Sequence, residues 1–276
     1  MTIEVAGQTS HAIEAPLSES DIRSGLVTRR IGIGLHLLQA VDSTNDEAAK
    51  LASGGAPEGT VVIADAQFRG RGRMGCQWES PKDVGLYLSV ILRPPIPPHA
   101  APILTLLGAV AVADAIERTT GLAAGVKWPN DLIVRGRKVA GILGEMAAEN
   151  SRLRHVVLGV GINVNQTEEG FKGELEKTAS SLRIEVGHHV DRTAMVRSLC
   201  RGLDDWYDRF LSDGVASILE RARQLCLTLG RAVVARSGNQ ELRGLAVAID
   251  DAGALVIRDD SGEAHRLLAG DVTLTE

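Results

Sequence analysis

Two arginines in a glycine-rich segment are the residues of this chain that are best suited to binding an anion. The segment has the sequence Gly70-Arg71-Gly72-Arg73-Met74-Gly75. A guanidinium group can hold carboxylate or phosphate oxygens through two hydrogen bonds at once, and glycine lets the backbone come close to a ligand. The segment therefore predicts an oxyanion site. The alternative is a solvated basic hairpin turn, because Gly favours turns.

The same segment matches the G-x-G-x-x-G fingerprint of dinucleotide-binding folds, but its context excludes that fold. A helix should begin at the third glycine, yet residues 76–81 have no helical periodicity. The acidic residue that holds the ribose is expected about 20 residues further on. The chain has Arg93-Pro94-Pro95 there. An NAD-dependent oxidoreductase is therefore rejected.

Three other clusters of polar residues and glycines could form parts of the same site. They are Asp42-Ser43-Thr44-Asn45-Asp46-Glu47, Lys127-Trp128-Pro129-Asn130-Asp131 with Lys138, and Gly159-Val160-Gly161-Ile162-Asn163. Each has a purely structural alternative. Thr44 with Glu47 predicts a capping box, the Pro-Asn-Asp sequence predicts a turn, and the glycine pair predicts a bulged strand. The helix end in the first cluster can serve both purposes, since its amides and hydroxyls can also bind a polar ligand.

The composition argues against several classes of function. The chain has 276 residues and a formal net charge of −5, so its summed field repels polyanions and nucleic acid is not expected as a main partner. Its three cysteines are far apart and lack zinc or disulfide spacing, which favours a reducing cytoplasm. The N-terminus lacks a signal-peptide pattern, and the most apolar stretch, 103–113, is shorter than the roughly 20 residues of a membrane span. We expect a cytoplasmic protein with no membrane partner and a buried helix at 103–113.

Alternating elements along the middle of the chain must position the polar clusters. β-branched runs predict strands at 60–64, 85–92, 126–134, 139–143 and 155–160. Helices are predicted after Ser43-Thr44, between Pro102 and Gly121, and at 193–211 after the capping residue Asp191. Short strands follow at 232–235, 242–249, 254–258 and 265–268. This order predicts a mixed α and β domain at 31–226, a small β domain at 227–276, and a loosely ordered or covering extension at 1–30.

Taken in order, the clusters resemble those of the biotin-protein ligases. The resemblance rests on Ser43-Thr44-Asn45, Gln67, Gly70-Arg71-Gly72-Arg73-x-Gly75, Trp78, Lys127-Trp128-Pro129-Asn130-Asp131, Lys138-Val139-Ala140-Gly141-Ile142-Leu143 and Gly159-x-Gly161-Ile162-Asn163. It covers nearly everything from about Leu35 to the C-terminus. It implies an α+β catalytic domain similar to that of class II aminoacyl-tRNA synthetases, followed by a small Src-homology-3-like β-barrel. The chain leaves no room for the winged-helix repressor domain of many bacterial members, so the short form is expected.

The resemblance implies an ATP-dependent biotin-protein ligase. Biotin would react with ATP and Mg²⁺ to give biotinyl-5'-AMP, and a lysine amine of a biotin carboxyl carrier domain would then displace AMP. A carboxylate must approach the α-phosphate, although two like unit charges about 4 Å apart repel by roughly 4 kcal/mol at an effective dielectric of about 20. Arg71, Arg73 and Lys138 would supply the compensating charge. The oligomeric state stays open, and a homodimer is compatible with the resemblance.

The resemblance also implies roles for single residues. Those expected to bind biotin are Ser43, Thr44, Asn45, Gln67, Arg71, Gly72, Arg73, Lys138, Gly159 and Gly161. Those expected to bind the nucleotide are Arg71, Arg73, Trp78, Asn130, Lys138 and Asn163. The expected catalytic residues are Lys138, Arg73 and Asp131, of which Asp131 would orient Mg²⁺ or the incoming amine. Because a neutral ureido ring needs hydroxyls and amides rather than charge, the Ser-Thr-Asn cluster suits it.

Two other functions stay open at this point. A lipoate or octanoate ligase or transferase has a similar fold, but its pocket would hold an aliphatic chain, whereas Ser43-Thr44-Asn45 and Gln67 favour a polar head. A non-catalytic sensor that holds an adenylate is disfavoured by the complete set of cations. For the ligase, we also expect residues 70–75 to be mobile without ligand and to order over the adenylate, because an activated anhydride must be kept from water.

Overall fold

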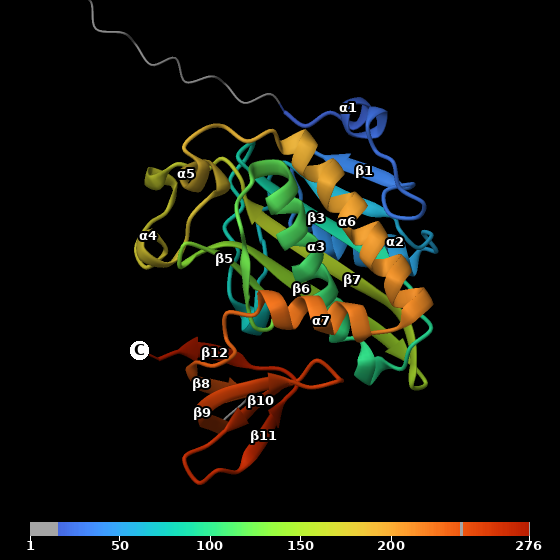
Figure 1. Cartoon of the computed structure of the whole chain (residues 1–276). Helices are drawn as coiled ribbons and strands as arrows, with labels where there is room; N and C mark the ends of the chain where they lie inside the picture. Colours follow the sequence, from blue (N-terminus) through green and yellow to red (C-terminus); the bar gives the residue numbers. More distant parts are fainter. Residues whose placement is uncertain (1–15, 238–239, 276) are drawn as a thin grey trace, which may run out of the picture.

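A mixed seven-stranded sheet forms the centre of the larger domain (Figure 1). The computed structural model describes residues 16–237 and 240–275. The strands follow the order β1-β2-β3-β7-β6-β5-β4. Their bounds are Leu35–Leu38 for β1, Val61–Ala64 for β2, Gly85–Leu92 for β3, Gly125–Lys127 for β4, Asp131–Val134 for β5, Arg137–Glu149 for β6 and Arg152–Asn163 for β7. Strands β1 and β2 run parallel, and the other neighbouring strands are antiparallel.

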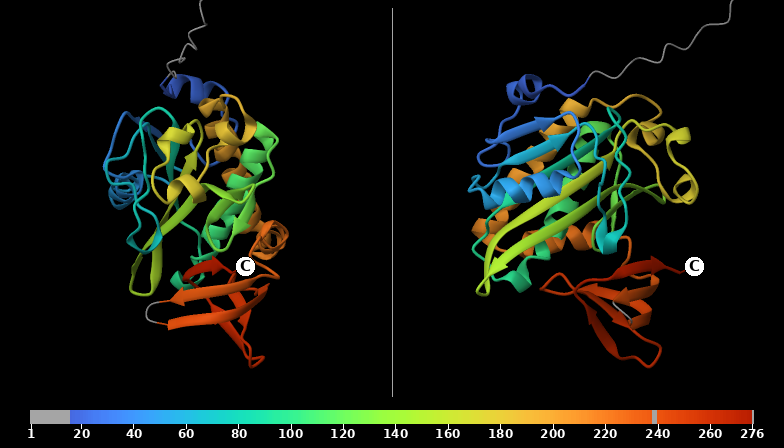
Figure 2. Two further views of the ribbon diagram at one scale, coloured as in Figure 1. Left: turned by 90° about the vertical axis from the view of Figure 1, so that its left-hand side faces the viewer. Right: turned by 180° about the vertical axis from the view of Figure 1, so that it is seen from behind.

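Helices cover both faces of this sheet (Figure 2). Helices α3 (Ile103–Thr120) and α6 (Arg192–Asp213) lie on one face, and α2 (Thr44–Ser53) lies on the other against β2, β3 and β7. Every residue of β3 is buried, as expected for a strand covered on both sides. The alanines of α2 pack on Val62, Ile91 and Val157, whereas the main core lies on the α3 side. The face under α2 is therefore the thinner layer, and the beginning of α2 lies at the candidate site.

The two long helices were predicted almost to the residue. Helix α3 follows Pro102 and ends at Gly121, whose φ of 72° closes it in the left-handed region that favours glycine. It is long and apolar enough to span a membrane, but it is mostly buried as a core helix. Helix α6 starts after Asp191, whose side chain accepts a hydrogen bond from the Ala194 amide. The apolar stripe predicted for it is buried, as the helical spacing required.

The described part of the N-terminal extension, residues 16–30, covers the large domain. Helix α1 (Glu19–Ser24) packs against α6 and buries Ile22 completely. The backbone amides of residues 29–31 donate to the Asp204 carboxylate over 2.7 to 2.8 Å. In the described structure the chain on both sides of residue 30 thus packs on α6, as the covering-segment alternative expects. The rest of the predicted extension, 1–15, lies outside the described residues.

The strand predicted at 126–134 is two strands, β4 and β5, joined by a turn at residues 128–130. Pro129 has no amide to donate to a ladder, and the buried Trp128 is held by Thr228 Oγ1 and the Gly253 carbonyl instead. Two short edge strands were not predicted, β1 in the large sheet and β12 in the small domain. The short helices α4 (Leu175–Thr178) and α5 (Leu182–Val186) and helix α7 (Ala216–Leu225) were also not predicted.

The C-terminal domain is a five-stranded antiparallel sheet below the end of the large one (Figure 1). Its order is β11-β10-β9-β8-β12, with bounds Ala232–Ser237 for β8, Gln240–Ile249 for β9, Leu255–Arg258 for β10, Ala264–Leu267 for β11 and Asp271–Leu274 for β12. The bond from Trp128 Nε1 to the Gly253 carbonyl, 3.1 Å, joins it to the β4–β5 turn. Arg223 of α7 adds a bond to the Ile249 carbonyl and an ion pair with Asp251. These contacts hold the small domain beside the site.

Candidate active site

Small residues on three neighbouring strands create a cavity of about 430 Å³ on the α2 side of the large sheet. Gly159 of β7 lies between Ser89 of β3 and Leu143 of β6, and two residues further on Gly161 lies between Tyr87 and Gly141. Residues two apart share a face of a strand, so both glycines face α2. Helix α2 begins over the first of these rows, and the hairpin loop of residues 70–78, here called the glycine loop, lies over the second.

Side chains at the two β7 positions would fill the site. A Cβ on Gly159 would lie 2.2 Å from Asn45 Oδ1, and a Cβ on Gly161 would lie 2.6 Å from Nε1 and Cε2 of the Trp78 indole. The bulged strand predicted here does not occur between β3 and β7, whose register is continuous. Both glycines instead let side chains from the opposite layer reach the sheet. Both glycines line the cavity, and their expected contact with biotin stays a prediction.

The first residues of α2 form a neutral, polar end of the cavity. The Thr44 amide and hydroxyl donate to Gln67 Oε1 over 2.8 and 3.0 Å, and Ser89 Oγ lies 2.8 Å from Thr44 Oγ1 and 2.6 Å from Asn45 Oδ1. The predicted capping box is wrong, because the N-cap is Ser43 and Thr44 is already the first helical residue. The Ser43 side chain makes no capping hydrogen bond in the described structure. These hydroxyls and amides are therefore directed at the cavity and at one another.

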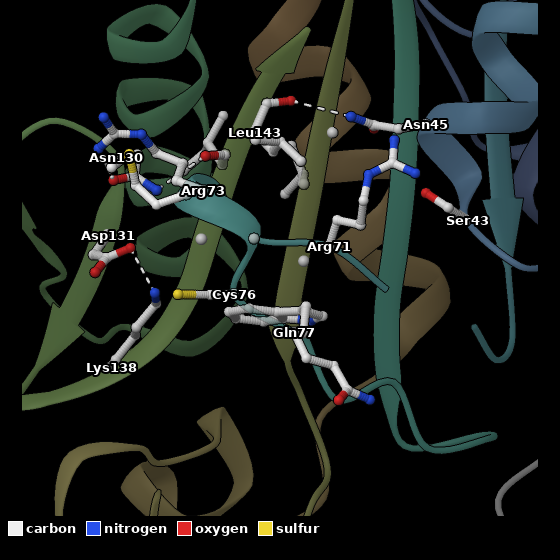
Figure 3. Close-up of a pocket in the computed structure, with 18 of the residues that line it drawn as sticks. Ser43, Asn45, Arg71, Arg73, Cys76, Gln77, Asn130, Asp131, Lys138 and Leu143 are labelled. Atoms are coloured by element: carbon white, nitrogen blue, oxygen red, sulfur yellow. Dashed lines mark hydrogen bonds and ion pairs between the residues drawn. The ribbon is translucent and has the colours of Figure 1, made fainter. Parts of the chain in front are cut away.

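Arg71 lies beside Ser43 and Asn45 at this polar end (Figure 3). One guanidinium nitrogen lies 2.7 Å from Asp46 Oδ2 of α2, and another lies 3.1 and 3.0 Å from the two carboxylate oxygens of Glu145 of β6. The bond to Asp46, and then that to Glu145, raise the pKa of Arg71. The arginine is thus held by two carboxylates from two different elements. An anionic ligand has to compete with them for it.

Arg73 is in a different electrostatic setting. Its Nη1 donates to Asn130 Oδ1 over 3.1 Å, and Asn130 is itself held by a bond to the Ile142 carbonyl. Among the described residues no carboxylate lies within ion-pair distance of it. Burial lowers the pKa of Arg73, and the more distant charges of Asp131 and Asp271 offset this only in part. A partly desolvated cation with a neutral partner is well placed to attract an anion.

Lys138 completes the cationic end. Its Nζ lies 2.6 Å from Asp131 Oδ1 and 5.4 Å from the centre of the Trp78 ring, within the range of a cation–π contact. Trp78 lies against Gly161, so the glycine loop ends on the floor of the cavity. The backbone amide of Trp78 donates to the Gly70 carbonyl over 2.9 Å, and this bond closes the loop as a hairpin. Loop and strand β6 thus bring three cations, Arg71, Arg73 and Lys138, to one cavity.

All but one of the residues expected to bind biotin or nucleotide, or to act in catalysis, line the cavity. The lining residues among them are Ser43, Thr44, Asn45, Gln67, Arg71, Gly72, Arg73, Trp78, Asn130, Asp131, Lys138, Gly159 and Gly161. Asn163 does not line it. Its amide donates to the Ser180 carbonyl and its oxygen accepts from Gln166, so the predicted nucleotide contact has no support from its position. Asn163 holds neighbouring segments together instead.

Several residues at the site were not predicted. Cys76, Gln77 and Arg236 line the cavity. Arg236 comes from the C-terminal domain, whose Asp271, in the segment 270–272 that the resemblance suggested for the ATP side, lines the cavity as well. Ser89 and Glu145 hold the lining residue Asn45 from behind. The signal for Ser89 was present in the sequence, because it is a polar residue in the middle of an apolar strand and is fully buried. The other contacts depend on tertiary packing that no local pattern reveals.

Fold and site together define a class of protein, an α+β domain of the class II aminoacyl-tRNA synthetase type with a cavity that joins a neutral polar end to a cationic end. Residues 37–163 match the biotin/lipoate A/B protein ligase family, and residues 228–274 match the biotin protein ligase C-terminal domain. The chain belongs to the biotin protein ligase family.

Named relatives agree with this assignment. The chain is 40% identical over 258 residues to the bifunctional ligase/repressor BirA of Bacillus subtilis, which covers 94% of this chain and 79% of the relative. It is 35% identical to the biotin--[acetyl-CoA-carboxylase] ligase of Paracoccus denitrificans, covering 82% of this chain and 95% of that protein. Among solved structures, the biotin protein ligase of Aquifex aeolicus in complex with biotin and ATP superimposes with a TM-score of 0.75 at 28% identity, covering 88% and 99% of the two chains.

Proposed function

We propose that this protein is a biotin-protein ligase, which forms biotinyl-5'-AMP from biotin and ATP and then transfers biotin to a lysine of a carboxylase carrier domain. The observation that carries the proposal is the single cavity with a neutral polar end and a cationic end. Its volume, about 430 Å³, falls in the range of small-ligand sites. Relatives named biotin--[acetyl-CoA-carboxylase] ligase suggest the acceptor.

The polar end suits the ureido ring of biotin. The ring is neutral and carries two N–H donors and one carbonyl acceptor, which hydroxyls and amides can satisfy. Ser43, Thr44, Asn45 and Gln67 present such groups and carry no charge. Buried polar groups left unpaired by a purely aliphatic ligand would cost free energy, so lipoate is disfavoured at this end.

The cationic end suits the first half-reaction. A carboxylate oxygen of biotin attacks the α-phosphorus of ATP, and the bond from that phosphorus to the diphosphate group breaks. Arg73 and Lys138 hold the two reacting anions together, and Arg71 closes the cavity from the side of α2. Because the guanidinium of Arg73 is already partly desolvated and anchored by Asn130, little reorganisation is needed when charge builds up on the phosphate.

Mg²⁺ would accompany ATP. Two carboxylates, Asp131 and Asp271, line the cavity, and this donor set fits an ion that is bound through phosphate oxygens, water and one or two carboxylates. When bound, the ion neutralises phosphate charge. In the structure Asp131 pairs with Lys138 over 2.6 Å and can therefore interact with an amine. In the second half-reaction it would orient the acceptor amine. The amine, in its neutral form, attacks the acyl carbon, the bond from that carbon to the phosphate oxygen of AMP breaks, and the proton of the amine is released as AMP leaves.

The proposal is tested by incubating the protein with ATP, Mg²⁺, a biotin carboxyl carrier domain and either biotin or lipoate. The mass of the carrier should rise by one biotinyl group in the first reaction and stay unchanged in the second. A carrier whose mass rises only with lipoate would favour the lipoate ligase. A bound adenylate without any transfer would favour the non-catalytic sensor.

A further inference from the structure

A chain of hydrogen bonds connects the polar end of the cavity to both ends of the glycine loop, and in it each amide group has one defined orientation. On one side the series starts at the loop residue Trp78, whose carbonyl accepts from Ser80 Oγ over 3.2 Å. Ser80 in turn accepts from Gln67 Nε2 over 2.9 Å, which leaves Gln67 Oε1 to face Thr44. The orientation of the Gln67 amide is thus set by the end of the loop.

On the other side the series returns to the start of the loop. Ser89 Oγ lies against Asn45 Oδ1, so the amide nitrogen of Asn45 points away, to Glu145 Oε2 at 2.6 Å. The same carboxylate accepts from Arg71 Nη2. Asn45 would bind the ring, whereas Arg71 belongs to the glycine loop. Glu145 is the one described residue that hydrogen-bonds to both.

Removal of the Glu145 charge would affect both partners. Among the described residues, the only other acceptor of the Asn45 amide nitrogen is the Leu143 carbonyl, and at 3.4 Å that hydrogen bond is weak. Arg71 would keep Asp46 but lose its connection to β6. Hydrogen bonds to charged groups are stronger than neutral ones, so neutral Gln is a poor substitute for Glu at this position.

We propose that Glu145 is a positioning residue that couples occupation of the ring end to closure of the glycine loop. This rests on the proposed function in that Asn45 must contact the biotin ring. A ring that fixes the Asn45 amide fixes Glu145, and Glu145 then holds Arg71 and the loop over the phosphate end. Asp46 offers a matched control, because it also pairs with Arg71 but has no hydrogen bond to Asn45 in the described structure.

The first test is a double-mutant cycle on biotin binding, measured by calorimetry without ATP. Asn45→Ala and Arg71→Ala are made singly and together, in the wild-type background and in the Glu145→Gln and Asp46→Asn backgrounds. In the wild-type and Asp46→Asn backgrounds, we expect the fold-change in Kd of the double mutant to differ by about fivefold to tenfold from the product of the two single-mutant fold-changes, as for coupled residues. In the Glu145→Gln background, the fold-change of the double mutant should equal the product of the two single-mutant fold-changes to within about twofold. Equal non-additivity in all three backgrounds would overturn the proposal.

The second test does not need biotin. Amide hydrogen exchange of residues 70–78 is compared in the ligand-free wild-type, Glu145→Gln, Asn45→Ala and Ser43→Ala proteins. Exchange should rise several-fold for Glu145→Gln and Asn45→Ala and stay unchanged for Ser43→Ala. An unchanged loop in Asn45→Ala contradicts the coupling even if biotin binds. If biotin does not bind at all, the proposed function fails, and the exchange data decide the role of Glu145 alone.

Discussion

Replacing Gly159 by alanine should damage the ring end of the site without unfolding the protein. The new Cβ would lie 2.2 Å from Asn45 Oδ1 and 2.9 Å from its Cγ, both far inside contact distance. The backbone of β7 cannot yield, since Gly159 is paired with Ser89 on one side and Leu143 on the other. The Asn45 side chain must therefore turn away.

The loss can be worked out from the bonds that Asn45 gives up. The bond from Ser89 is neutral and contributes about 0.5–1.5 kcal/mol, and the bond to Glu145 is charge-assisted and contributes about 1.5–3 kcal/mol. We expect the free energy of unfolding to fall by about 2–4.5 kcal/mol if both are lost. Loss of a ligand contact of the same kind would weaken biotin binding by roughly tenfold to a hundredfold.

Urea denaturation measures the first quantity, and calorimetric titration with biotin measures the second. Gly54→Ala is the matched control, because Gly54 ends the same helix α2 and a Cβ there would meet its nearest atom at 3.4 Å, an ordinary contact. A Gly159→Ala protein that binds biotin within twofold of wild type would refute the placement of the ring beside Asn45.

Three further outcomes are expected. Arg73→Ala and Lys138→Ala should each slow adenylate formation, followed by biotin-dependent exchange of diphosphate into ATP, by about 10²–10³-fold; near-wild-type exchange would contradict their roles. Cys76 lines the cavity and is exposed, so biotin plus ATP should slow its alkylation several-fold relative to the half-buried Cys226, as read by mass spectrometry of peptides; equal rates would argue against loop closure. Burial and two neighbouring arginines lower the pKa of His155 below 6.5, so the folded state binds this proton only at a lower pH than the unfolded state does. The free energy of unfolding should therefore fall as the pH drops below about 6.5. In His155→Gln this dependence on pH should be weaker, as measured by urea denaturation at several pH values.

The sequence was sufficient for elements whose pattern is local. Helix α6 followed from one apolar stripe and a capping aspartate, and β3 followed from a continuous apolar run. The patterns failed where tertiary contacts decide. The composition of residues 126–134 predicts one strand, but a turn at 128–130 interrupts it. Trp128 donates hydrogen bonds to Thr228 and Gly253 of the second domain instead of to a neighbouring strand. Strand β1 has only four residues and pairs along one edge, which is too short for a clear period.

The same distinction applies to the site. Motif spacing selected residues that line one cavity, because residue types suited to polar and anionic groups recur at these positions. That they touch ligand stays a prediction. Asn163 does not line the cavity, since an asparagine that follows a glycine strand can equally well hold the backbone, as its bond to the Ser180 carbonyl does. Its predicted nucleotide contact stays a prediction. Motif spacing also interpreted Thr44 and Glu47 as a cap, although the Thr44 hydroxyl donates to Gln67. A local motif cannot tell whether a polar group is bonded within its own segment or across the fold.

The pairing of the cations without ligand explains how one cavity could favour the adenylate over free biotin. Arg71 is held by Asp46 and Glu145, and Lys138 is held by Asp131, so an incoming anion must replace an existing partner at each of them. Arg73 alone of these three has a neutral partner within hydrogen-bonding distance in the described structure. A single carboxylate would displace one protein carboxylate and gain little. An adenylate, with its phosphate joined to the acyl group, can engage Arg73 and compete for a second cation in the same binding event, so the exchange is more favourable for the adenylate than for free biotin.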